Sequence, residues 1–182
     1  MLDYRYHRSP DRYPDLPDKV MFGKEQMRWL KEALVSSRAP FKIIAGGNQM
    51  LNPQTGEESF SLYKNEYAEL LSWIKSNGVE GVLFLSGDIH RTELIRLEDA
   101  SFYPLYDYTN SPFTSGTHSP DRVQANPAVV PGTQVAGKRN CGMLRFDGPR
   151  TDRKLAMECY DNQGRLLWKH EVKATELQPA KR

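Results

Sequence analysis

An aspartate and a histidine stand close together at the end of the most apolar segment of the chain. Asp88 and His90 follow the apolar run 82–85, which is typical of a strand covered on both faces. If the chain stays extended beyond this strand, the two side chains point to the same side, about 6–7 Å apart along the backbone. A carboxylate and an imidazole so placed can bind one metal ion or two neighbouring ions. We therefore predict that Asp88 and His90 are metal ligands; the alternative is a turn-capping aspartate and a packed histidine.

Asn48 and Arg91 are further candidates for the same site. Asn48 follows a pair of glycines at the end of a short β-branched segment, where an amide oxygen would face the site. We consider it a candidate metal ligand, and the alternative is an ordinary turn residue. Arg91 comes directly after His90, and a guanidinium matches the geometry of phosphate oxygens. Arg91 is thus a candidate substrate-binding residue, with an outward surface arginine as the alternative.

Three residues distant from this motif also carry suitable groups. Arg5 and Arg8 are candidates for binding an anion at the end of the sheet, and we include Arg5 among the predicted substrate-binding residues. The alternative for this pair is an ion pair with Asp3 or Asp11. His118 lies in a segment rich in Ser and Pro, where it either lines a substrate cleft or is an exposed loop residue.

Alternating helices and strands are expected to position these residues. The pattern of apolar residues predicts helices over 24–37 and 63–76 and strands over 41–45 and 82–85. This order predicts an α/β sheet with helices on its faces. Ligands bind at the carboxyl ends of the strands in such sheets, so the loops that carry Asn48 and Asp88 should meet there.

The second half of the chain predicts an antiparallel arrangement. Strand-like segments cover 92–97, 105–109, 140–146, 155–160 and 166–172. A loop rich in Pro, Gly, Ser and Thr fills 110–138, and a loop of this length is usually functional or mobile. The polar tail from Thr175 is expected to fray.

The composition excludes several classes of protein. A formal charge of +2 on 182 residues is too small to predict a nucleic-acid partner. No apolar run approaches the roughly 18 residues of a membrane helix, and no basic segment followed by an apolar core marks a signal peptide in this chain. Cys141 and Cys159 are too few for a disulfide framework, so they form either one bridge or, by default, two buried free thiols.

Several segments carry a recognisable pattern in a fixed order, up to about residue 147. They are Leu2-Asp3-Tyr4-Arg5-Tyr6-His7-Arg8, Phe22-Gly23-Lys24-Glu25-Gln26-Met27-Arg28-Trp29-Leu30, Ala39-Pro40-Phe41-Lys42-Ile43-Ile44, Leu85-Ser86-Gly87-Asp88-Ile89-His90, Tyr103-Pro104-Leu105-Tyr106 and Thr109-Asn110-Ser111-Pro112. In this order they resemble the PhoD-like alkaline phosphatases, a branch of the calcineurin-like metallophosphoesterases. The Gln-x-x-Trp-Leu and Gly-Asp-x-His pieces together are the most specific part of the resemblance.

The resemblance implies a fold and an activity. It implies an α/β metallophosphoesterase-type β-sandwich with flanking helices, over 1–174, followed by a polar tail over 175–182. It implies a phosphatase or phosphodiesterase that acts on a phosphate ester with metal-activated hydroxide. The cofactors it implies are iron with calcium, with zinc or manganese as alternatives, and the implied location is periplasmic or extracellular.

The chain also departs from the family in the motifs that supply most of the metal ligands. Apart from the Gly-Asp-x-His motif itself, the early Asp-x-His, Gly-Asp-x-x-Asp and Gly-Asn-His-Asp patterns do not occur, and Gln49 stands where the last of them would need a histidine. We therefore expect the chain to be the C-terminal half of such an enzyme, with an incomplete fold and site. The alternative is a catalytically inactive, truncated remnant.

Overall fold

A four-stranded mixed sheet forms the middle layer of the molecule. The computed structural model describes residues 1–54, 58–123 and 125–179. The sheet contains β1 (Lys42–Ala45), β2 (Val82–Ser86), β3 (Glu93–Asp99) and β4 (Phe102–Thr109) in the order β1-β2-β4-β3. β1, β2 and β4 run parallel, and β3 is antiparallel to β4. The carboxyl ends of the three parallel strands therefore share one edge of the molecule.

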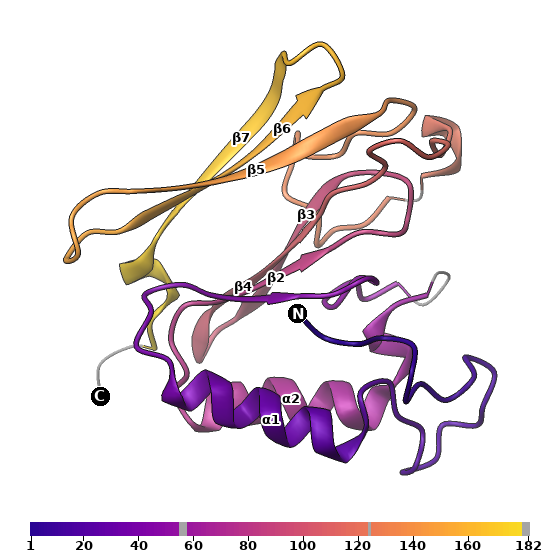
Figure 1. The fold of residues 1–182 in the computed structure, drawn as a ribbon, viewed down its shortest axis with the longest axis vertical. Helices are drawn as coiled ribbons and strands as arrows, with labels where there is room; N and C mark the ends of the chain where they lie inside the picture. The colour runs from indigo at the N-terminus through magenta and orange to yellow at the C-terminus, as the bar shows by residue number, and fades with distance from the viewer. Residues whose placement is uncertain (55–57, 124, 180–182) are drawn as a thin grey trace.

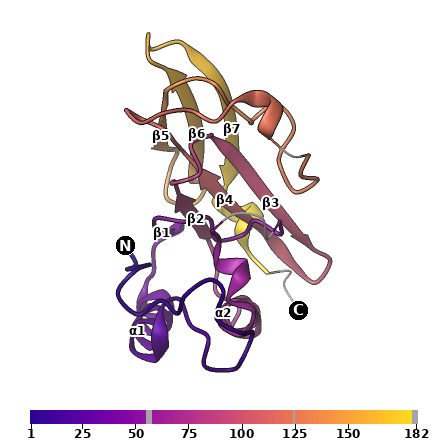
Figure 2. The same cartoon turned by 90° about the vertical axis from the view of Figure 1, so that its right-hand side faces the viewer.

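Helices cover one face of this sheet and a second sheet covers the other (Figures 1 and 2). The helices are α1 (Gly23–Ser36) and α2 (Lys64–Ser76). The second sheet is the antiparallel meander β5 (Asn140–Asp147), β6 (Lys154–Asp161) and β7 (Leu166–Lys173). Short 3-10 turns lie at Phe60–Leu62, Pro120–Arg122 and Ala174–Leu177. The expected α/β sandwich with flanking helices is confirmed. Both helices lie on one face of the sheet, however, whereas the order of elements predicted helices on its faces.

The apolar pattern of the sequence explains these layers. β2 lies between both layers, and four of its five residues are buried, as its apolar run predicts. α1 buries Met27, Leu30 and Leu34, which recur at helical spacing. α2 buries Leu70 and Ile74 in the same way, together with one charged residue, Glu66.

Glu66 links the two helices. Its carboxylate accepts hydrogen bonds from the backbone N–H groups of Met21, Phe22 and Gly23, at 2.7, 3.0 and 2.8 Å. The Gly23 N–H is the first of α1, and those of Phe22 and Met21 directly precede it. N–H groups at a helix start have no partner within the helix and lie at its positive dipole end. A side chain of α2 therefore caps α1, although sequence spacing alone gives no sign of it.

The long loop between β4 and β5 lies along the outer edge of β3. Backbone hydrogen bonds join Thr92 to Val135 in both directions, at 2.9 and 2.8 Å. Val130 donates to the Leu94 carbonyl at 2.8 Å, and Arg96 donates to the Ala128 carbonyl at 2.8 Å. This part of the loop is thus tied to the sheet.

The tail predicted to fray from Thr175 packs against the molecule instead. The turn Ala174–Leu177 buries Leu177 completely, and the Leu177 carbonyl accepts a hydrogen bond of 2.8 Å from the Gly81 N–H. The prediction missed this contact because Leu177 is a single apolar residue in a polar segment. Residues 180–182 lie outside the described residues.

The remaining predictions concern the cysteines and the membrane. Cys141 and Cys159 are free thiols, so the bridged alternative is wrong. Among the described residues, no helix combines the length and the apolar character that a membrane span requires.

Candidate functional site

The loops that follow the three parallel strands meet, as the strand order predicts. The N–H of Gly87, after β2, donates to the carbonyl of Gly47, after β1, at 2.9 Å. The N–H of Asn110, after β4, donates to the Ser86 carbonyl at 2.9 Å. Asn48 and Asp88 are thereby brought together from positions 40 residues apart.

The first residues of the chain also reach this edge of the sheet. Tyr4 lies directly over Gly46, where a Cβ atom would stand 1.9 Å from the tyrosine ring. Only glycine fits beneath this ring. The packing of Tyr4 on Gly46 brings the neighbouring Arg5 and Arg8 towards the loop that carries Asn48.

The backbone of the Asp88–His90 segment differs from the extended path that we expected. β2 ends at Ser86, and Asp88 and His90 have φ values of +71° and +54°. Left-handed backbone is uncommon for residues with a side chain and gathers at functional sites. Ile89 between them is buried. The left-handed residues are thus the two predicted ligands themselves, whereas the preceding Gly87 does not adopt a positive φ.

Asn48 is held between two carboxylates. Its Nδ2 donates to Asp88 Oδ2 at 2.9 Å and to Glu58 Oε2 at 3.1 Å. Because both neighbours accept hydrogen bonds, the amide nitrogen must face them, and this fixes the direction of Oδ1. Asn48 is 1% exposed, and its Oδ1 is buried without a hydrogen-bond partner among the described residues. A buried carbonyl oxygen without a donor, beside a carboxylate, fits the coordination of a metal cation.

Glu58 joins Asn48 to the arginines of the first segment. It forms ion pairs of 3.0 Å with Arg5 and 2.9 Å with Arg8. The hydrogen bond from Arg8 is the main reason why the pKa of Glu58 falls from 4.5 to about 2. Arg8 also pairs with Asp11, which is the alternative given for it. In the part of the chain that the structure describes, the Arg5 side chain pairs with neither Asp3 nor Asp11. Glu58 belongs to no sequence motif and was not among the predicted site residues.

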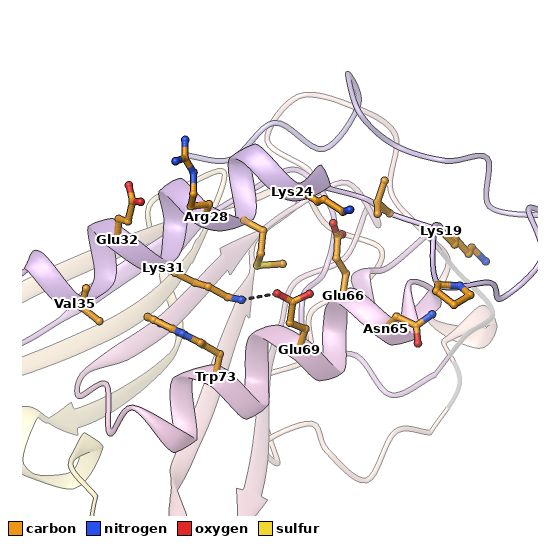
Figure 3. A pocket seen from close by; sticks show the side chains of 13 residues that line it. Lys19, Lys24, Arg28, Lys31, Glu32, Val35, Asn65, Glu66, Glu69 and Trp73 are labelled. Atoms are coloured by element: carbon orange, nitrogen blue, oxygen red, sulfur yellow. Dashed lines mark hydrogen bonds and ion pairs between the residues drawn. The ribbon is translucent and has the colours of Figure 1, made fainter.

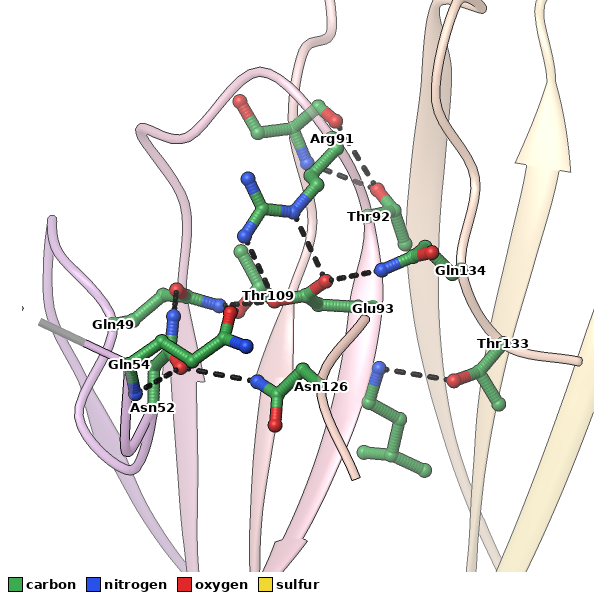
Figure 4. A network of polar contacts seen from close by, with 12 residues as sticks. Gln49, Asn52, Gln54, Arg91, Thr92, Glu93, Thr109, Asn126, Thr133 and Gln134 are labelled. Carbon is green, nitrogen blue, oxygen red and sulfur yellow. Dashed lines mark hydrogen bonds and ion pairs between the residues drawn. The ribbon is translucent and has the colours of Figure 1, made fainter. Parts of the chain in front are cut away.

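Arg91 points inward, so the alternative of an outward surface arginine is wrong (Figure 4). Its Nε donates to Glu93 Oε2 at 3.0 Å, and both residues are buried. Gln49 and Gln134 also donate to Glu93, each at 2.9 Å. Binding of phosphate by Arg91 remains a prediction, and a phosphate would have to share the guanidinium with Glu93.

Gln49 and Asp107 hold the Asn48 loop from beneath. Gln49 is fully buried and donates to Glu93 and Thr109, so its amide helps to hold the loop in place. Asp107 accepts hydrogen bonds from the N–H groups of Met50 and Leu51 at 2.7 and 3.0 Å. Complete burial raises the pKa of Asp107.

His118 lies beside His90, and its role in lining a substrate cleft stays a prediction. The two rings are 5.6 Å apart between centroids, and the His118 N–H donates to the His90 carbonyl at 3.0 Å. Ser115, from the same loop, places its Oγ 3.5 Å from His90 Nε2. The long loop therefore forms one wall beside the Gly-Asp-x-His motif.

The described residues alone do not form a complete metal site. No cluster of three His, Cys, Asp or Glu side chains suited to a metal ion occurs among them. The ligand predictions for Asp88, His90 and Asn48 thus amount to a partial set, with Asn48 oriented by Asp88.

A separate cavity of about 380 Å³ lies between α1 and α2 (Figure 3). Met27 and Trp73 contribute its apolar lining, and an ion pair of 2.5 Å between Lys31 and Glu69 crosses it. None of the predicted site residues lines this cavity.

Comparisons with known proteins agree with the resemblance. The model of the family "PhoD-like phosphatase" matches residues 1–147. Alkaline phosphatase D of Bacillus subtilis is 28% identical over 82 residues, which cover 41% of this chain and 14% of that protein. The solved "Structure of PhoD" superposes with a TM-score of 0.59 at 21% identity, over 86% of this chain and 36% of the other. The chain therefore spans only part of these relatives, and by its family match it belongs to the PhoD-like phosphatases.

Proposed function

We propose that this chain contributes to a metal-dependent phosphoester hydrolase, in which Asp88, His90 and Asn48 bind metal. The observation that carries the proposal is the buried, unpartnered Oδ1 of Asn48 beside the Asp88 carboxylate. Leaving such an oxygen without a donor costs about 1–3 kcal/mol, and a bound cation would remove that cost. Family membership supports the phosphoesterase class.

The metals would be iron with calcium, or zinc or manganese. When bound, they would neutralise phosphoryl oxygens and lower the pKa of a bound water. The protein's own contribution is orientation. Glu58 fixes the Asn48 amide and is itself neutralised by Arg5 and Arg8, so a cation would meet a carboxylate at Asp88 and a neutral carbonyl at Asn48. Arg5, which is 61% exposed at its side chain, can turn from Glu58 to a substrate phosphate.

A second candidate is a protein that binds a cation weakly and does not hydrolyse esters. The lack of a cluster of three acidic, His or Cys ligands among the described residues favours it. In that case Asp88, His90 and Asn48 would hold a single ion, too few groups to clamp a phosphate between two metals.

Titration calorimetry with Ca²⁺, Mn²⁺ and Zn²⁺ tests the metal site. We expect the 182-residue chain to bind a cation and Asp88→Asn and His90→Ala to lose that binding, whereas His7→Ala, at an exposed histidine outside the site, should keep it. Equal binding by the chain and its His90→Ala variant would refute the proposal.

Hydrolysis of a chromogenic phosphodiester tests whether the chain is catalytic by itself. For the chain alone we expect a rate near background with iron, calcium, zinc or manganese, because the ligand set is partial. Turnover at ordinary enzymatic rates that His90→Ala abolishes would show instead that the chain completes a catalytic site by itself.

A further inference from the structure

A second cavity lies on the other side of the loop that contacts His90. It has a volume of about 550 Å³ and lies between this loop and the turn that joins β6 to β7. Ser115, Gly116 and Thr117 line it from the loop, together with Lys138 and Arg139. The β6–β7 turn contributes Asp161 and Arg165. We call this the basic cavity.

The charges that line the basic cavity are positive and largely uncompensated. Lys138 and Arg139 are exposed, and neither has a carboxylate partner within the part of the chain that the structure describes. Asp161 is the acidic residue of the lining, but its oxygens are occupied within its own turn. They accept hydrogen bonds from the N–H groups of Gln163 and Arg165 and from Arg165 Nε, at 2.9, 2.9 and 2.8 Å. The cavity is therefore suited to an anion.

The basic cavity adjoins the candidate metal site through a single residue. Ser115 lines the cavity and also places its Oγ 3.5 Å from His90 Nε2. The carbonyl of the same serine accepts a hydrogen bond of 3.1 Å from Arg139 Nε. Only Ser115 would thus separate an anionic group in the cavity from a phosphate held at His90.

Backbone donors add to the cations. The N–H groups of Gly116 and Thr117 have no acceptor among the described residues, whereas the next one, from His118, is bound to His90. Gly116 has open space around its Cα, since a Cβ there would meet no atom within 4 Å. Free N–H groups on an open glycine turn are suitable donors for phosphate oxygens.

We infer that the basic cavity is an anion subsite, which binds a second anionic group of a phosphoester held at His90. The assignment to substrate rests on the proposed function; binding of an anion by the cavity itself does not. The preferred substrates would then be phosphoesters with a further phosphate or carboxylate near the scissile phosphate, rather than esters of neutral alcohols alone.

Inorganic pyrophosphate is the probe, titrated into the metal-free chain and followed through backbone amide NMR shifts. We expect the largest shifts at Gly116, Thr117 and Gly137. We expect Lys138→Ala/Arg139→Ala to weaken binding about tenfold, the combined effect of two exposed ion pairs. The control is Lys24→Ala/Arg28→Ala, which removes the same charges from exposed residues of α1 without a carboxylate partner among the described residues.

Two results would overturn the subsite. One is an equal loss of affinity in both double variants, which would mean that pyrophosphate responds only to net charge. The other is a set of shifted amides outside the basic cavity. His90→Ala separates this inference from the metal proposal, because it should abolish cation binding and leave pyrophosphate binding within about twofold of the unsubstituted chain.

Discussion

Replacing Asn48 with aspartate should make the stability of the protein depend on a divalent cation. The variant puts a third carboxylate between Asp88 and Glu58, in place of an amide that donates to both at 2.9 and 3.1 Å. Each hydrogen bond to a charged group is worth about 1.5–3 kcal/mol, and solvent reduces this because Asp88 is exposed and Glu58 is half-buried. We expect Asn48→Asp to lower the free energy of unfolding by about 2–4 kcal/mol at neutral pH without cation.

A cation at this position would reverse the effect. It would replace the lost donor and neutralise the added charge, and ligand that binds the folded state stabilises it by mass action. Millimolar calcium should therefore raise the stability of Asn48→Asp more than that of the unsubstituted chain. Asn48→Leu is the matched control, because it removes the same hydrogen bonds and adds no ligand, so calcium should not restore it.

Urea denaturation at pH 7, with and without calcium, measures all three proteins. Lowering the pH towards 5 should also recover part of the stability of Asn48→Asp, because neighbouring carboxylates raise the pKa of the new one. Equal stability of Asn48→Asp and the unsubstituted chain without calcium would refute the role given to the Asn48 amide. Equal stabilisation of Asn48→Asp and Asn48→Leu by calcium would refute the cation site beside Asp88.

Other parts of the structure give three further expectations. Glu66→Gln should lower the free energy of unfolding by about 2 kcal/mol, since an amide cannot accept from all three N–H groups of Met21, Phe22 and Gly23. The control Glu69→Gln should change it little. Equal urea midpoints for the two variants would contradict the capping role of Glu66. Glu58 has a pKa of about 2 in the folded chain against 4.5 unperturbed, so its contribution is present above pH 4.5 and lost as the pH falls towards 2. Acid titrations of the chain and Glu58→Gln should therefore converge at low pH, and parallel curves would contradict this. Burial raises the pKa of the Cys159 thiol to about 12, so a thiol reagent at pH 8 should modify the half-buried Cys141 first; faster reaction at Cys159 would be inconsistent with the packing.

The order of the layers could be predicted from the sequence, but little of the side-chain geometry of the site could. The apolar run of β2 and the glycines after β1 are local signals, and they correctly predicted where Asp88 and Asn48 would lie. The left-handed backbone at Asp88 and His90 was not predictable, because neither residue is a glycine and no turn motif marks the position. Glu58 was missed for a related reason: its partner Arg8 lies 50 residues away, and no spacing rule links them.

Arg91 illustrates the same limit within a short distance. Its partner Glu93 is only two residues away, yet the inward direction depends on Gln49 and Gln134, which approach Glu93 from other segments. Burial of a charge is favourable only when all its partners are in place. Such a network is recognisable once the fold is known.

The loop along the outer edge of β3 should limit association between molecules at high protein concentration. An uncovered outer strand presents a row of free N–H and C=O groups, to which a strand of another molecule can add. Here Val135, Val130 and Ala128 occupy the hydrogen-bonding groups of Thr92, Leu94 and Arg96 along that row. The loop thereby protects this side of the sheet from intermolecular strand addition, and substitutions that detach it should promote aggregation as well as disturb the wall beside His90.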